Sequence, residues 1–197
     1  MKTTIYMMRH GGVENPQGIL YERLAGFPLS QEGKEQALAM AKKFEAGNIK
    51  LCQIVSSPLA RTAQTAAIIA DHLKVPMRTD ERLTEWGVGF WAGRTVKEFY
   101  EKSGYYKEPM NMAGLEPHDQ TAIRVLSVVD ELKRECAGKP SLIVSHRESL
   151  ASAILKLQGG DYSSIHDVPM PKASVWQLDF ADGQFVSAKL KWEAPRT

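Results

Sequence analysis

Short apolar runs alternate along the chain with longer stretches in which apolar residues recur at helical spacing. Three of the short runs predict buried strands that end abruptly in polar residues, at residues 3–8, 51–55 and 141–145. The longer stretches predict helices, the first capped by Ser30 and the second opened by Ser57 and Pro58, at about residues 30–46, 57–73, 119–137 and 147–157. Strands that alternate with helices in this way favour a parallel sheet.

The end of the chain and one internal segment depart from this alternation. Residues 175–180 and 184–192 predict a terminal hairpin around Asp182 and Gly183. Residues 76–117 are irregular, with one helix expected at about residues 96–102, and long excursions of this kind commonly cover a site. We therefore expect an α/β fold, a three-layer α/β/α sandwich whose mostly parallel sheet has helices on both faces and an antiparallel C-terminal edge.

The composition is that of an ordinary folded protein. Of 197 residues, 43% are hydrophobic and 24% are charged, which excludes disordered, collagen-like and coiled-coil chains. The length suits one domain over residues 1–197, with a lid or insertion at about residues 76–117. A net charge of +2 does not indicate nucleic acid or a membrane surface as partner. Because no stretch resembles a signal peptide or a membrane span, we expect a cytoplasmic protein.

The chain contains two cysteines, Cys52 and Cys136. No second pair accompanies them to build a metal site or a disulfide framework, and this favours a reducing compartment. We expect both to be small, buried hydrophobic side chains and not nucleophiles.

Charged and polar residues collect where the three strands end. Arg9 and His10 follow the first strand, Arg61 follows the second, and His146 and Arg147 follow the third. In an open α/β sheet, ligands bind at the carboxyl ends of the strands, so we expect these side chains to share one crevice. Arg61 also lies in the first turn of a helix, where free N–H groups favour an anion. The crevice is therefore expected to bind negative charge.

Two histidines in one crevice raise the alternative of a zinc site. A metal site needs a third ligand, and the arginines beside both histidines would repel a cation. A phosphoryl group suits the same residues better, because guanidinium groups bind phosphate oxygens and a neutral imidazole can attack phosphorus. We expect no metal, and phosphoryl transfer through histidine.

Five motifs in sequence order resemble those of the histidine phosphatase superfamily, which includes the cofactor-dependent phosphoglycerate mutases. They are residues 8–11 (MRHG) with Asn15, residues 28–37 (PLSQEGKEQA), residues 56–66 (SSPLARTAQTA), residues 83–93 (LTEWGVGFWAG) and residues 144–146 (VSH). The resemblance covers about residues 4–160, and several motifs in order are far more specific than any one alone.

The resemblance implies that His10 is the nucleophile that becomes phosphohistidine. Arg9, Arg61 and His146 would hold the phosphoryl oxygens and stabilise the transition state. Asn15 would be an auxiliary phosphate contact.

The resemblance also implies an acid. Glu85 would protonate the leaving oxygen and then take a proton from the incoming water or alcohol. Its pKa must be raised by desolvation for that role, and we expect Trp86, Phe90 and Trp91 to form the apolar walls around it.

The sequence departs from the superfamily pattern in three places. Arg147 stands where glycine commonly follows the second histidine, and it would either contact the phosphate or substrate or point away. The threonine often found after the first motif is absent, and no acidic residue precedes Pro28. None of these changes removes a principal catalytic group, so they bear on substrate class more than on chemistry.

The leading functional hypothesis is a metal-independent phosphomonoesterase that acts on a small phosphorylated metabolite, without a cofactor, and lets water resolve the phosphohistidine. The alternative is a phosphoglycerate mutase, with 2,3-bisphosphoglycerate as phosphoryl donor. In the resemblance, mutases carry a longer basic segment between the acid and the second histidine. The basic candidates here are Arg94, Lys97, Lys102 and Lys107. The short segment favours a phosphatase.

A third hypothesis, from another class, is a noncatalytic anion-binding regulator. An acid facing a nucleophile argues against it, because a binding protein needs no acid. A homodimer through the sheet edge at the terminal hairpin stays open.

The remaining histidines and aromatic residues have structural interpretations. We expect His72, His118 and His166 on the surface. A small satellite core under the irregular segment is expected from Trp86, Phe90, Trp91, Phe99, Tyr100, Tyr105 and Tyr106.

Overall fold

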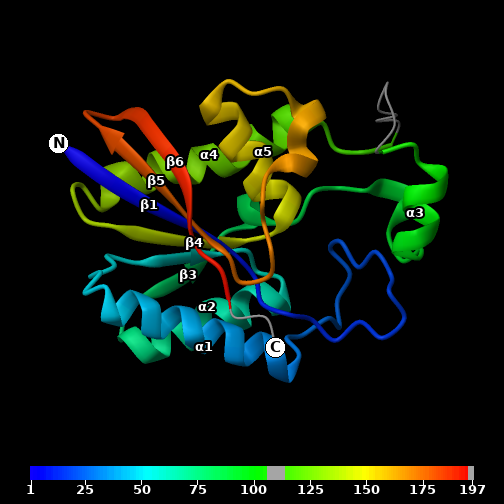
Figure 1. Cartoon of the computed structure of the whole chain (residues 1–197), viewed down its shortest axis with the longest axis horizontal. Coiled ribbons are helices and arrows are strands. Elements are labelled where there is room, and N and C mark those ends of the chain that lie inside the picture. The colour runs from blue at the N-terminus through cyan, green and yellow to red at the C-terminus, as the bar shows by residue number, and fades with distance from the viewer. Residues whose placement is uncertain (106–113, 195–197) are drawn as a thin grey trace.

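The computed structural model describes residues 1–105 and 114–194, which are built around one sheet (Figure 1). Its strands are β1 (Lys2–Arg9), β2 (Ile54–Ser56), β3 (Met77–Thr79), β4 (Ser141–Ser145), β5 (Val175–Ala181) and β6 (Gln184–Trp192). They lie in the order β3-β2-β4-β1-β5-β6. Strands β3, β2, β4 and β1 run parallel to one another, and β5 and β6 add an antiparallel edge.

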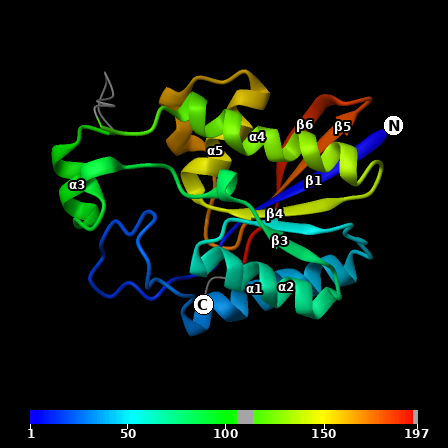
Figure 2. The same ribbon diagram turned by 180° about the vertical axis from the view of Figure 1, so that it is seen from behind.

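Helices cover both faces of this sheet, as the two opposite views show (Figures 1 and 2). The pair α1 (Gln31–Ala46) and α2 (Ala60–Leu73) lies on one face, and the pair α4 (His118–Glu135) and α5 (Arg147–Gln158) lies on the other. The short α3 (Val96–Lys102) stands to the side. The predicted three-layer α/β/α architecture with its antiparallel C-terminal edge is therefore confirmed. Among the described residues, no helix combines the length and apolarity that a membrane crossing requires.

The central strands are buried on both faces, which explains their continuous apolar runs. Met7 and Ile143 point toward α4 and α5, in a core that includes Val129 and Ile154. Their neighbours in sequence point the other way: Met8 and Val144 pack with Met40, Phe44 and Ile69 of α1 and α2. This alternation is the period of two that a strand imposes on its side chains.

Most predicted boundaries agree with the structure, with three differences in and after the second strand. That strand spans three residues, Ile54–Ser56, and starts later than the predicted residue 51. β3 was not predicted, because its three residues, MRT, carry no apolar alternation and their place depends on pairing with β2. The helix α2 begins at Ala60 with Leu59 as its N-cap, two residues beyond the predicted proline start.

The irregular segment 76–117 contains the predicted helix α3 and two short 3₁₀ turns, η1 (Glu81–Leu83) and η2 (Gly89–Trp91). Its buried residues form what we call the aromatic cluster: Trp86, Val88, Trp91, Phe99, Tyr105 and Leu115. This confirms part of the predicted satellite core. Phe90 and Tyr100 are 62% and 43% exposed and do not belong to it, and Tyr106 lies outside the described residues.

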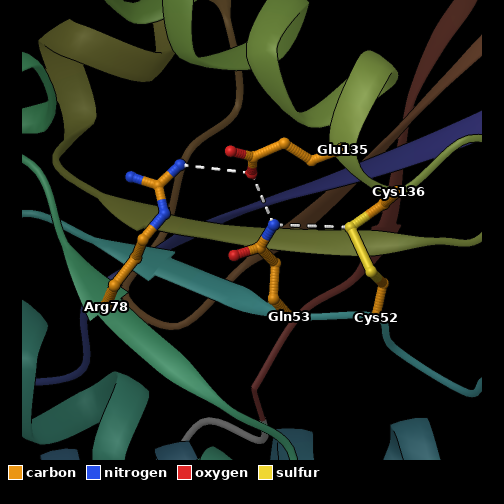
Figure 3. Close-up of a disulfide and its surroundings, with 5 residues drawn as sticks. All are labelled: Cys52, Gln53, Arg78, Glu135 and Cys136. Atoms are coloured by element: carbon orange, nitrogen blue, oxygen red, sulfur yellow. Dashed lines mark hydrogen bonds and ion pairs between the residues drawn. A yellow bond between two sulfur atoms is a disulfide. The ribbon is translucent and has the colours of Figure 1, made fainter.

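A disulfide joins Cys52 to Cys136, with their Cα atoms 6.0 Å apart (Figure 3). The prediction of two separate thiols was therefore wrong, and cysteine usage no longer favours a reducing compartment. The bridge links the segment before β2 to the C-cap of α4. Gln53 lies beside it, with its amide nitrogen 2.7 Å from Glu135 Oε2 and 3.4 Å from Cys136 Sγ (Figure 3).

His118 is buried, contrary to the prediction that it lies on the surface. Its ring stacks on Trp86 with centroids 4.9 Å apart, and its nitrogens lie 3.2 Å from the Tyr105 hydroxyl and 3.0 Å from the Ser152 hydroxyl. Burial lowers the pKa of His118 to about 4. His118 lies at the start of α4 and packs into the aromatic cluster, against residues such as Trp86 that precede it in the irregular segment. His72 and His166 are half-buried.

Candidate active site

The carboxyl ends of the parallel strands bring the two motif histidines together. β1 and β4 pair in register, with Arg9 opposite Ser145, so the residues that follow these partners, His10 and His146, leave the sheet side by side. Their ring centroids are 5.4 Å apart. The backbone N–H of His10 donates to the Ser145 carbonyl at 3.0 Å, which fixes this arrangement. Both histidines therefore lie in one site at the carboxyl ends of the strands, where the sequence predicts a crevice.

The glycines of two sequence motifs allow the nucleophile loop to touch the start of α1. A Cβ atom on Gly11 would lie 2.4 Å from the Gly33 carbonyl oxygen, and one on Gly33 would lie 2.0 Å from the Gly12 oxygen. Neither position can accept a side chain without moving backbone. The motif at residues 28–37 therefore supports the loop after β1.

His10 is held as a neutral imidazole with a defined tautomer. Its Nδ1 lies 2.8 Å from the Gly11 carbonyl oxygen. Because a carbonyl only accepts, Nδ1 carries the proton and Nε2 keeps its lone pair. Burial, and then the positive charge of Lys172, lower the pKa of His10 well below its usual value. A neutral ring with a free Nε2 is the form that can attack an electrophile.

Arg9 and Arg61 place buried guanidinium groups beside the histidines. Arg61 is 1% exposed and donates to the Glu22 carbonyl at 2.6 Å, and Arg9 donates to the Met170 carbonyl at 2.7 Å. The Nε atoms of both arginines are buried and have no hydrogen-bond partner among the described residues. Buried donors without partners are rare, and two cationic ones in one site indicate that an anion binds there.

Glu85 lies next to His146, on the loop after η1. Its Oε1 accepts from the backbone N–H of Trp86 at 2.8 Å, and its Oε2 lies 3.7 Å from Nδ1 of His146. Burial, and then the negative charge of Glu148, raise the pKa of Glu85 to about 7. The expected desolvation of this carboxyl is thus present. Trp86 lines the adjoining cavity, whereas the exposed Phe90 does not.

His146 connects this carboxyl group to the second strand. Its Nε2 lies 2.9 Å from the Ser57 hydroxyl, and its Nδ1 is buried without a hydrogen-bond partner in the described residues. Burial, and then the charge of Arg61, lower the pKa of His146 well below its usual value. The ring is therefore neutral, and its Nδ1 is the nitrogen that faces Glu85.

A cavity of about 280 Å³ adjoins this cluster and contains the two remaining predicted contacts, Asn15 and Arg147. The Asn15 side chain exchanges hydrogen bonds with the Ile19 backbone at 2.9 and 3.1 Å, which shapes the loop that forms the cavity wall. Arg147 does not point away from the site. It donates to the Glu148 carboxylate at 2.9 Å and to the His166 carbonyl at 3.3 Å.

The rest of the cavity lining combines aromatic rings with carboxylates. The aromatic members are Tyr21, Trp86, Phe99, Tyr100 and Tyr105, and the acidic ones are Glu22, Glu85 and Glu148. Of the basic residues considered for a mutase, Arg94 and Lys102 pair with Glu98 on α3 and do not line the cavity. Lys97 lies 3.9 Å from Glu101, and Lys107 is outside the described residues.

Sequence reasoning missed two residues of this site, Lys172 and Tyr21. The Lys172 ammonium donates to the Tyr21 hydroxyl at 3.1 Å, and the Arg61 guanidinium lies 4.5 Å above the Tyr21 ring. Neither residue belongs to a motif, and both reach the site from loops. Within residues 1–105 and 114–194, no three His, Cys, Asp or Glu side chains are grouped to hold a metal ion.

Comparison with known proteins agrees with this geometry. The chain is 34% identical over 167 residues to the uncharacterized protein Rv0525 of Mycobacterium tuberculosis, with 80% of each chain covered. It is 28% identical to phosphoserine phosphatase 1 of Hydrogenobacter thermophilus, covering 94% of this chain and 90% of that one. A mycobacterial glucosyl-3-phosphoglycerate phosphatase superposes with a TM-score of 0.81 at 26% identity, covering 98% and 99% of the two chains.

The family assignment extends over nearly the whole sequence. The family model of the histidine phosphatase superfamily (branch 1) matches residues 5–193. That range includes every residue placed in the site above, from Arg9 to Lys172. The chain therefore belongs to the histidine phosphatase superfamily.

Proposed function

We propose that the chain is a metal-independent phosphomonoesterase that passes the phosphoryl group of a small metabolite to His10 and then to water. One observation carries the proposal. A neutral imidazole with a free Nε2 and a carboxyl group with a pKa of about 7 both lie beside His146, in a site whose two arginines have buried Nε atoms without partners among the described residues. That combination supplies a nucleophile and an acid at the same pH.

In the first step, Nε2 of His10 attacks the phosphorus atom and forms a P–N bond. The P–O bond to the leaving alcohol breaks, and the alcohol oxygen takes the proton of Glu85. Arg9, Arg61 and Nδ1 of His146 bind the non-bridging oxygens, because their buried donors lack other partners. The products of this step are the free alcohol, phosphohistidine and an ionised Glu85.

In the second step, water attacks the phosphorus atom from the side that the alcohol has left. Glu85 accepts a proton from this water, the P–N bond breaks, and its electron pair returns to Nε2 of His10. Inorganic phosphate leaves, and both residues regain their starting forms. The pKa of about 7 lets Glu85 alternate between acid and base without a large energetic cost in either direction.

The cavity supports hydrolysis of a small ester in preference to mutase chemistry. Its volume of about 280 Å³ is at the lower end of the range for small-molecule sites. A phosphoglycerate would bring a carboxylate toward Glu22 and Glu148, and the guanidinium of Arg147 is already paired with Glu148. Two relatives named as phosphatases also support hydrolysis.

The test is phosphate release in EDTA from a panel of monoesters, measured for the native chain and for His10→Ala. The panel contains p-nitrophenyl phosphate, phosphoserine, phosphoethanolamine and 3-phosphoglycerate, the last with and without 2,3-bisphosphoglycerate. The matched control is His72→Ala, which removes a half-buried histidine that pairs with Glu45 on the outer helices.

We expect turnover in EDTA that His10→Ala abolishes and His72→Ala leaves intact. We also expect phosphoethanolamine to exceed phosphoserine, which differs from it by one carboxylate. Interconversion of phosphoglycerates much faster than phosphate release would establish a mutase instead. Phosphate binding with no turnover on any ester would establish a noncatalytic anion binder.

A further inference from the structure

Lys172 lies on a loop that is tied directly to the nucleophile. The loop follows the 3₁₀ segment η3 (Tyr162–Asp167) and leads into β5. The N–H of Ala173 donates to the His10 carbonyl at 3.1 Å, and the N–H of Arg9 donates to the Ser174 carbonyl at 3.1 Å. The backbone on the C-terminal side of Lys172 is thereby fixed against Arg9 and His10.

The backbone at Ala173 is strained in a way that holds this position. Ala173 has a φ of 56°, in the left-handed region that residues with a Cβ atom rarely adopt, and it is fully buried. Such strain is found where surrounding structure enforces a functional geometry. Here the conformation directs the chain so that Lys172 faces the site while β5 continues along β1.

The ammonium group of Lys172 has a neutral hydrogen-bond partner. Within the described residues it donates to the Tyr21 hydroxyl at 3.1 Å, and no ion pair with a carboxylate accompanies that bond. Lys172 is half-buried, and an ammonium that has lost part of its hydration is unfavourable without an anionic partner. The arrangement is stabilised once an anion binds next to it.

The surrounding charges identify where that anion lies. The pKa of Lys172 is well below its usual value because of burial, and then because of the positive charges of Arg9 and Arg61. In turn, Lys172 exerts the largest electrostatic effect on the pKa of His10 after burial itself. Three cationic side chains therefore converge on the nucleophile, and only a group with more than one negative charge balances them.

We propose that Lys172 is a further catalytic residue, whose ammonium group binds a non-bridging phosphoryl oxygen beside Arg9 and Arg61 and is oriented by the Tyr21 hydroxyl. This inference rests on the proposed function, since it adds a ligand to the same phosphoryl group. The site then contains three cationic side chains, whereas a phosphomonoester carries two negative charges. The excess positive charge stabilises the transition state as negative charge accumulates on the phosphoryl oxygens.

The test measures binding of inorganic phosphate by calorimetry, together with kcat/KM for p-nitrophenyl phosphate. Lys172→Met keeps an unbranched side chain, one atom shorter, and removes its charge. We expect phosphate to bind about 10- to 100-fold more weakly, as for the loss of one charged hydrogen bond, and kcat/KM to fall by at least as much. Lys172→Arg restores most of both, because it returns the positive charge.

The control is Lys191→Met on β6, at the far edge of the sheet. Lys191 also donates to a neutral group, Gln177 Oε1 at 2.7 Å, and also lies over an aromatic ring, that of Tyr6. We expect the Lys191→Met variant to bind phosphate as tightly as the native chain. Thermal unfolding of each variant reports any loss of the fold.

Two results overturn the proposal. One is phosphate affinity and kcat/KM of Lys172→Met within twofold of the native chain. The other is an equal loss in Lys172→Met and Lys172→Arg with lowered unfolding temperatures, which assigns Lys172 to packing alone. If the native chain binds phosphate but hydrolyses no ester, the proposed function fails while the binding comparison still decides the role of Lys172.

Discussion

Nδ1 of His146 lies 3.7 Å from Oε2 of Glu85, and the His146 ring meets that of His10 at a centroid distance of 5.4 Å. The second histidine is therefore next to both the proposed acid and the proposed nucleophile. Because burial keeps both imidazoles neutral, the exchangeable proton of this group resides on Glu85 near neutral pH.

Glu85→Gln removes the acid and should separate substrates by leaving group. Esters of simple alcohols need a proton on the departing oxygen, so we expect their kcat/KM to fall by roughly 100- to 10,000-fold. p-Nitrophenyl phosphate has a good leaving group and should lose far less. The measurement is the ratio of the two kcat/KM values, and equal losses for both esters would contradict an acid role.

The raised pKa of Glu85 also predicts a pH-dependent gain in stability for the same variant. The pKa rises from 4.5 to about 7 on folding, so between these values the folded chain holds a proton that the unfolded chain has released. Stability from this group is therefore lost as pH rises through that window. Glu85→Gln should be more stable than the native chain by roughly 2 kcal/mol at about pH 8, and by much less at about pH 5.

Denaturant unfolding at the two pH values checks this expectation. A control is Glu81→Gln, which changes an exposed carboxylate on the adjacent 3₁₀ turn. A larger gain for Glu85→Gln at the lower pH would reverse the sign and refute the assignment of a raised pKa.

Arg124 should position Glu85 without touching the substrate. Its guanidinium donates to the carbonyls of Arg82, Thr84 and Glu85 at 2.8, 2.7 and 3.2 Å, and its Nε donates to Glu116 at 2.7 Å. It thus holds the backbone of the loop that carries the acid. We expect Arg124→Met to lower kcat/KM for simple alkyl esters by roughly 10- to 100-fold through misplacement of Glu85.

The same variant should lose about 3 kcal/mol of stability, because Glu116 keeps a partly buried charge with fewer partners. p-Nitrophenyl phosphate again distinguishes the two effects, since its hydrolysis depends less on Glu85. Arg78→Met is the matched control, as it removes ion pairs with Asp80 and Glu131 outside that loop. Parallel losses on all substrates would indicate a purely structural role for Arg124.

How far the sequence predicts this site depends on how each residue reaches it. His10, Arg61 and His146 follow parallel strands or open the helices after them, so the order of elements was enough to bring them together. Lys172 could not be found in this way, because its position depends on hydrogen bonds between residues 173–174 and the start of the chain. A single lysine beside a proline carries no pattern that distinguishes it from a surface residue.

The predictions of the fold that were wrong also concern features fixed by residues far away in the sequence. The three residues of β3 have no apolar alternation, and they form a strand because they pair with β2. Burial of His118 depends on Trp86 and Tyr105, which the irregular segment brings to it. The pairing of Cys52 with Cys136 depends on where α4 ends relative to β2, which no local pattern encodes.

The disulfide makes a stability prediction of its own. It closes a loop of 84 residues, and a cross-link of that span restricts the unfolded chain strongly. We expect the double variant Cys52→Ser with Cys136→Ser to lose about 2–4 kcal/mol in the free energy of unfolding. When the unsubstituted chain is unfolded in denaturant without reductant, a thiol titration should find no free thiol. Two titratable thiols would contradict the bridge.

Detection of phosphohistidine on His10 tests the proposed mechanism directly. Rapid acid-free quenching during turnover of p-nitrophenyl phosphate, followed by peptide mass spectrometry, locates any phosphoryl group on the chain. We predict one phosphoryl group on the peptide that contains His10, stable in base and labile in acid, and absent from His10→Ala. Steady turnover with no phosphorylated peptide, or with the phosphoryl group on another residue, would contradict the proposed mechanism.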